Sequence, residues 1–196
     1  MQSPFARLQR WCNRKALLGL GVMVVPWMSA CAQVSAPPAE VTQLLASIEH
    51  RLALAKQVAL NKWDTGKPVE DRARERQVID NARASAVDRK IDPEWAEQFF
   101  AAQIEANKLF QYARLDAWTR AGKAPDEPRK DLAKDIRPVL DQLQDELLQR
   151  MAAFAPYRTS PDCRRWMTSA IPSVDESPLR NMTLLRATAG LCVSGG

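Results

Sequence analysis

The stretch "IDPEWAEQFFAAQIEANKLFQYARLDAW", residues 91–118, indicates that this protein is helical. Asp92 is a good N-cap residue, and Pro93 suits the first helical position, where a missing N–H costs little. We expect the helix to continue to about Arg120, because "AGKAPDEPRK" then supplies the residues that end helices. Strand-like alternation is absent here and in the rest of the chain after residue 39.

Helical patterns extend to both sides of this segment. Before it, apolar residues recur at three-and-four spacing up to "DTGKP", where the pattern breaks. Pro138 must either kink the helix in which it lies or mark that helix's true start. Further helices are expected over 40–63, 69–88, 131–154, 162–171 and 177–190. We therefore predict an all-α fold, a helical bundle of about six helices with a C-terminal helical subdomain.

The N-terminal residues resemble an export signal. The segment 1–15 carries four cations and no acid, and the fifteen residues 16–30 are uncharged. We predict a signal peptide over 1–32, a Pro/Ala-rich linker over 33–39 and a single domain over 40–196. Cleavage after "ACA" would release a periplasmic or secreted product, whereas "MSAC" also resembles a lipobox. The protein would then meet a membrane only if Cys31 is lipidated; an uncleaved anchor is less favoured by so short an apolar run.

The formal charge of +5 comes mostly from this leader. Without its four cations, 24 cations face 23 anions, which leaves a net charge of +1. Bulk charge therefore gives no support for nucleic-acid binding.

The few cysteines and the single histidine limit which kinds of catalytic and metal site this chain can form. Cys163 and Cys192 remain as one pair beyond the leader, and in an oxidising compartment we expect them to form a disulfide that clips the C-terminal helices. His50 is the sole histidine, so a His-dependent nucleophile is difficult to build. Because no Cys/His cluster has metal-ligand spacing, we expect neither a metal nor another cofactor.

The stretch "KPVEDRARER", residues 67–76, places charges on an apolar helix face. On a helical wheel, three of them share the arc of Val78 and Ala82, which should face the bundle: Asp71, Arg74 and Glu75. The other three should face water: Glu70, Arg72 and Arg76. Taken singly, each inward charge is more simply explained as a salt bridge at the bundle edge.

Neighbouring helices repeat this pattern. Arg51 and Lys62 are eleven residues apart, so they differ by about 20° around one helix and by roughly 16 Å along it. Asn107 and Gln111 lie one turn apart in the 91–120 helix. Arg51, Lys62 and Arg74 together outnumber the inward carboxylates, and burying unbalanced cations is costly. A bound small dicarboxylate would resolve that imbalance.

These residues resemble the motifs of the all-helical chorismate mutases over roughly residues 41–120. Asp71, Arg74 and Glu75 match the motif of the second helix, and Arg51 and Lys62 match the cations of the first. The third helix matches at Asn107, where relatives carry a small hydroxyl residue, and at Gln111, where they carry Gln or Glu. The leader and the late cysteine pair resemble the secreted subclass, in which a fourth-helix arginine completes each site. Arg137 is its best match.

The resemblance implies rearrangement of chorismate to prephenate with no cofactor. Lys62 and Gln111 would contact the ether oxygen, and three arginines with Asn107 would hold the carboxylates: Arg51, Arg74 and Arg137. Asp71 and Glu75 would orient the ring hydroxyl and steady the arginines. The resemblance also implies a homodimer. Three alternatives stay open: an isochorismate-pyruvate lyase, a periplasmic bundle that binds a dicarboxylate without turnover, and a structural helical protein.

Overall fold

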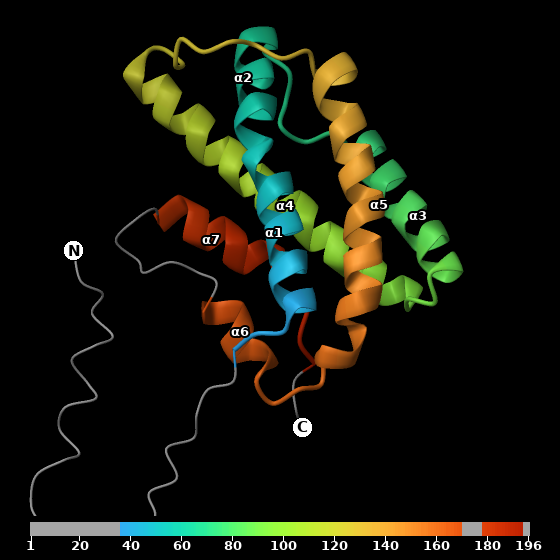
Figure 1. The fold of residues 1–196 in the computed structure, drawn as a ribbon. Coiled ribbons are helices and arrows are strands. Elements are labelled where there is room, and N and C mark those ends of the chain that lie inside the picture. The colour runs from blue at the N-terminus through green and yellow to red at the C-terminus, as the bar shows by residue number, and fades with distance from the viewer. Residues whose placement is uncertain (1–35, 170–177, 194–196) are drawn as a thin grey trace, which may run out of the picture. The chain divides into compact units, whose positions relative to one another are not determined.

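Helices account for the regular secondary structure that the computed structural model describes, over residues 36–169 and 178–193 (Figure 1). This confirms the all-α prediction within those ranges. The predicted signal peptide and the first part of the linker lie outside the described residues, as do Cys12 and Cys31. The elements are α1 (Ala39–Ala53), α2 (Ala55–Thr65), α3 (Arg72–Asp88), α4 (Pro93–Ala121), η2 (Leu132–Ile136), α5 (Arg137–Phe154), η3 (Ala155–Tyr157), α6 (Cys163–Ser169) and α7 (Pro178–Ala187).

The single helix expected over 40–63 is interrupted at Leu54. Leu54 keeps right-handed helical angles, but its N–H bonds to the carbonyl of Arg51, three residues back, at 3.3 Å. This tightened turn separates α1 from α2, and α2 continues the path of α1 in Figure 1. The turn contains neither glycine nor proline, which explains why the sequence pattern did not predict it.

Local capping sets the start of α3 and α4. The Asp92 carboxylate accepts from the Glu94 N–H at 2.9 Å, with Pro93 in the first position, as expected. The helix predicted to begin at 69 begins instead at Arg72, because Asp71 is its N-cap and accepts from the Arg74 N–H at 3.2 Å. Asp71, one of the inward charges of the 67–76 stretch, therefore also has a structural role as a helix cap.

Pro138 marks the start of a regular helix and does not kink one. α5 begins at Arg137, so Pro138 lies in its first turn, where its missing N–H is tolerated. The preceding π-helical turn, η2, is capped by Asp131, whose carboxylate accepts from the N–H groups of Ala133 and Lys134. The Lys134 contact and the other backbone contact lower the pKa of that carboxyl. Arg137 is therefore the first residue of α5.

α4 is the element on which the others assemble. It packs against α2, α3 and α7, while α1 packs against α5. Figure 1 shows α4 crossing behind α1 and α2, with α3 and α5 to one side of them and α7 to the other. The main core includes Leu44, Phe99, Phe100, Leu147 and Phe154, which are almost completely buried. Ala59, Leu60 and Trp118 form a smaller cluster between α2 and α4. None of the described helices combines the length and apolar character needed to cross a bilayer.

The predicted disulfide is confirmed between Cys163, which opens α6, and Cys192, which follows α7. Their Cα atoms are 5.8 Å apart, and Cys163 is buried in the main core. The bond therefore fixes the two C-terminal helices to one another.

Replacing both cysteines by alanine should lower the free energy of unfolding by about 3–4 kcal/mol, the loop-closure contribution for 29 residues. Urea denaturation of the oxidised protein and of the double variant measures this difference. Wild-type protein treated with a reductant is the matched control and should unfold like the variant. Equal urea midpoints for the oxidised protein and the variant would contradict the expected stabilisation.

Candidate active site

One cavity, called here the first cavity, is lined by all eight residues that the sequence singled out for a site. It lies between α1–α2, α3, α4 and the segment from η2 into α5. The structure brings these eight together: Arg51, Lys62, Asp71, Arg74, Glu75, Asn107, Gln111 and Arg137. Six apolar side chains share the lining: Val58, Val69, Val78, Ile104, Leu132 and Leu140.

Arg51 and Lys62 are buried cations on one face of α1–α2. They are 6% and 7% exposed. Burial, together with repulsion from Arg74, lowers the pKa of Arg51 to about 10, although Asp141 opposes the shift. Burial likewise lowers the pKa of Lys62 below its usual value. Within the described ranges, no carboxylate lies at ion-pair distance from the Lys62 Nζ, and the Arg51 Nε has no acceptor.

The 67–76 stretch divides as the helical wheel predicted. Asp71, Arg74 and Glu75 are half-buried at the cavity, and the other three charges are exposed: Glu70, Arg72 and Arg76. Glu75 accepts from the Asp71 backbone N–H at 3.1 Å, so the two acidic residues cap the start of α3 reciprocally. Both carboxylates are therefore held in place before any ligand binds.

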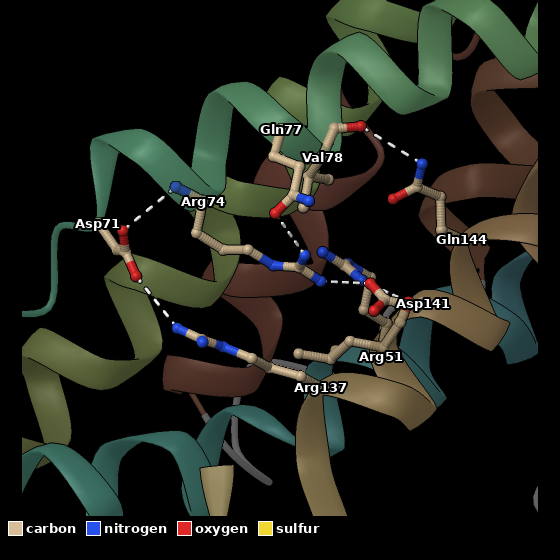
Figure 2. A network of polar contacts seen from close by, with 9 residues as sticks. Arg51, Asp71, Arg74, Gln77, Val78, Arg137, Asp141 and Gln144 are labelled. Atoms are coloured by element: carbon tan, nitrogen blue, oxygen red, sulfur yellow. Dashed lines mark hydrogen bonds and ion pairs between the residues drawn. The ribbon is translucent and has the colours of Figure 1, made fainter. Parts of the chain in front are cut away.

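Figure 2 shows how α3 and α5 aim their arginines into a common space. The Arg137 Nη2 donates to the Asp71 Oδ2 at 3.2 Å. Arg74 pairs with the Asp141 carboxylate and donates from Nη1 to the Gln77 Oε1 at 2.8 Å. Arg51 lies beside Asp141 in the same view and donates from Nη1 to the Leu140 carbonyl at 3.4 Å. Three guanidinium groups thus converge around two carboxylates.

α4 contributes two amides, one turn apart. Gln111 is 4% exposed, and its Nε2 donates to the Asn107 Oδ1 at 2.6 Å. This bond uses one of the two amide hydrogens of Gln111 and leaves the other available to a ligand. The predicted contact of Asn107 with a substrate carboxylate stays a prediction; within the protein, its Oδ1 accepts from the Gln111 amide and orients it.

Sequence reasoning missed two charged residues of the first cavity. Lys108 Nζ pairs with Glu75 at 3.2 Å and with Glu105 at 2.7 Å. Burial would lower the pKa of Lys108, but these hydrogen bonds outweigh it and raise the pKa. Asp141 lies one helical turn after Arg137. Residues at this spacing share a helix face, so the position of Arg137 could have indicated that Asp141 also lines the cavity. Lys108 is adjacent to Asn107 in sequence, but its pairing depends on how α3 packs on α4.

The charges of the first cavity are unequal in number. Five cations and three carboxylates line it, and Lys108 also pairs with Glu105 outside the lining, so cations still outnumber the carboxylates available to them. None of the described lining side chains is a serine, cysteine or histidine. The polar groups are therefore suited to bind and orient a small dianion and to donate hydrogen bonds to it, not to attack it.

A family model and two solved structures that resemble this chain are all described as chorismate mutases. The family model for chorismate mutase type II matches residues 42–112. A crystal structure of chorismate mutase from Burkholderia phymatum is 43% identical, with a TM-score of 0.75 over 79% of this chain and 97% of that one. A second, from Burkholderia thailandensis, is 34% identical, with a TM-score of 0.73 over 79% of this chain and all of that one.

A curated relative extends the similarity over a larger share of the chain. The secreted chorismate mutase of Mycobacterium tuberculosis H37Rv is 26% identical over 190 residues, which cover 91% of this chain and 94% of the relative. The Burkholderia structures are matched over nearly their whole length at more than 30% identity, and they have the same helical fold. This chain therefore belongs to the chorismate mutase family.

Proposed function

We propose that the first cavity rearranges chorismate to prephenate. The observation that carries this proposal is the excess of cations over carboxylates among converging side chains, two of which, Arg51 and Lys62, are buried, because chorismate is a dianion. Its rearrangement is an intramolecular pericyclic shift in which one C–O bond breaks and one C–C bond forms. The reaction needs no protein nucleophile. The enzyme must supply a compact substrate conformer and donors where negative charge grows.

The three arginines are assigned to the two substrate carboxylates. Arg51, Arg74 and Arg137 come from three different helices, so together they can hold both carboxylates in one geometry. Arginine suits this task because its planar fork pairs with a carboxylate through two parallel hydrogen bonds. Asp71 and Asp141 keep the guanidinium groups of Arg137 and Arg74 oriented until the substrate arrives. Asp71 and Glu75 are assigned to the ring hydroxyl, which leaves the positive charge for the carboxylates.

Lys62 and Gln111 are assigned to the ether oxygen, which becomes more negative in the transition state. Lys62 is a buried ammonium, and in the described part of the chain no carboxylate competes for it. Gln111 has a spare amide hydrogen, and Asn107 holds the amide in one orientation. Asn107 is therefore assigned to positioning Gln111, in addition to its predicted contact with a substrate carboxylate. Both donors are in place before the reaction, so little reorganisation is needed as charge develops.

Export from the cytoplasm is part of the proposal. Support comes from the basic and apolar segments in residues 1–30 and from relatives that are named secreted chorismate mutases. The disulfide fits an oxidising compartment. We propose cleavage near residue 32 and a homodimer; membrane attachment would require lipidation of Cys31.

Direct assays with chorismate and isochorismate test the proposed reaction. We expect purified protein to convert chorismate to prephenate and to leave isochorismate unchanged. Release of pyruvate from isochorismate would identify a lyase instead. Calorimetric binding of chorismate without any prephenate would identify a binding protein, and no binding at all would leave only a structural role.

The pH profile tests the role of Gln111. A glutamine amide donates without being protonated, so wild-type activity should change little between about pH 5 and 8. In Gln111→Glu, the carboxyl donates only when protonated, and kcat/KM should therefore fall as the pH rises through that range. Gln98→Glu, an exposed change on α4, is the control and should keep the wild-type profile. Loss of wild-type activity towards neutral pH, with Gln111→Glu unaffected, would refute the assignment.

A further inference from the structure

A second cavity, of about 380 Å³, lies on the opposite face of α1–α2 from the first. Residues of α1, α2, α4 and α7 line it. Arg51 of α1 faces the first cavity, while its neighbour Leu52 faces the second. On α4, Gln111 lines the first cavity, whereas Phe110 and Arg114 line the second. The two cavities share no lining residue, so the mechanism above makes no use of the second.

Most charged residues of the second cavity are already paired. Lys56 pairs with the carboxylate of Glu127, which lies outside the cavity lining. Arg180 pairs with Glu49 at 2.6 Å, and both of these residues line the cavity. These two ion pairs account for every charged lining residue except Arg114.

Arg114 is a cation without a matching anion. Its guanidinium lies over the Phe110 ring, 5.0 Å from the ring centre, and its Nε is buried with no acceptor. Considering only residues 36–169 and 178–193, no carboxylate is within ion-pair distance of it. A buried donor that has lost its water and gained no partner is costly, and an anionic ligand would supply the missing acceptor. The cation–π contact with Phe110 helps to hold the guanidinium in place before a ligand binds.

Apart from Thr183, the uncharged lining residues are apolar, with Leu52, Phe110 and Leu184 among them. A cavity of this size, with an apolar part of its wall and one unmatched cation, can hold a small molecule that has an apolar body and a charged group. We propose that the second cavity binds a compact monocarboxylic acid, with its carboxylate on Arg114 and its apolar body against Leu52 and Leu184. One cation without an anionic partner, Arg114, favours a ligand with a single negative charge.

Calorimetry with 3-phenylpropanoate on the purified protein tests this proposal. We expect saturable binding of one molecule per chain, and at least tenfold weaker binding of the neutral 3-phenylpropanamide, which has the same shape. Arg114→Met should weaken binding of the acid at least tenfold. Arg120→Met is the matched control, because Arg120 lies on the same helix and is exposed beside Asp116. It should bind like the wild type.

Arg74→Ala separates the two cavities. This variant should bind 3-phenylpropanoate with unchanged affinity, whereas a loss of binding would place the ligand in the first cavity and overturn the proposal. Equal binding of acid and amide, unchanged affinity in Arg114→Met, or no saturable heat with the wild-type protein would overturn it as well. The comparison of acid and amide needs no variant, so it stands even if Arg114→Met fails to fold. Failure here leaves the proposed mutase activity untouched.

Discussion

Lys62→Ala should lower kcat roughly 10²-fold or more, the usual effect of removing one donor from a preorganised site for a developing negative charge. Lys62 is 7% exposed and projects from α2 into the first cavity. Its positive charge is kept there at a cost, since burial lowers its pKa. A buried ammonium stabilises negative charge more strongly than an exposed one does, so Lys62 should act most strongly when negative charge develops on the ether oxygen in the transition state. Steady-state kinetics with chorismate measures the loss.

The matched control for Lys62 is Lys123→Ala. Lys123 is exposed beyond the end of α4 and is not part of the first cavity. It should keep wild-type turnover. If Lys62→Ala also retains near-normal kcat, the assignment of Lys62 to the ether oxygen is wrong, whatever happens to KM.

Arg51→Met should change stability and activity in opposite directions. Arg51 is 6% exposed, its Nε has no acceptor among the described residues, and burial and Arg74 disfavour its charge. Replacing such a cation with an apolar side chain of similar length should raise the free energy of unfolding by about 1–4 kcal/mol. Asp141 keeps Arg74 as its partner, so the replacement leaves no carboxylate unpaired.

The same change should lower kcat/KM by roughly 10²–10³-fold, because a substrate carboxylate would lose a buried charged partner worth 2–5 kcal/mol. Urea denaturation and kinetics on the same preparation measure both effects. Arg76→Met, an exposed change on α3, should alter neither. A variant that is both less stable and fully active would mean that Arg51 has a structural role only.

The orientation of side chains on each helix could be predicted from the sequence. A wheel distinguishes Arg74 and Glu75 from Arg72 and Arg76 because helical geometry fixes which residues share a face, whereas Asp71 reaches the first cavity as the N-cap of α3. The wheel also places Arg51 and Lys62 on one face, and the structure has both lining the same cavity. Arg137 came from the family resemblance, since no local pattern identifies a single arginine at a helix start.

Contacts between helices could not be predicted in the same way. Pairing of Arg74 with Asp141 and of Lys108 with Glu75 depends on how α3 packs against α5 and α4. The turn at Leu54 was not predicted either, and it lies where packing changes from α1 on α5 to α2 on α4. The disulfide was easier to predict, since beyond residue 32 only one pairing of cysteines is available.

The most direct test of the central claim is the loss of chorismate absorbance with purified protein, with prephenate quantified in the same reaction. We expect wild-type protein to consume chorismate catalytically and to form one prephenate for each chorismate lost, while Lys62→Ala at equal concentration is at least 10²-fold slower. Chorismate that persists at the buffer-only rate in the presence of folded wild-type protein would contradict the assignment of the first cavity as a chorismate mutase site.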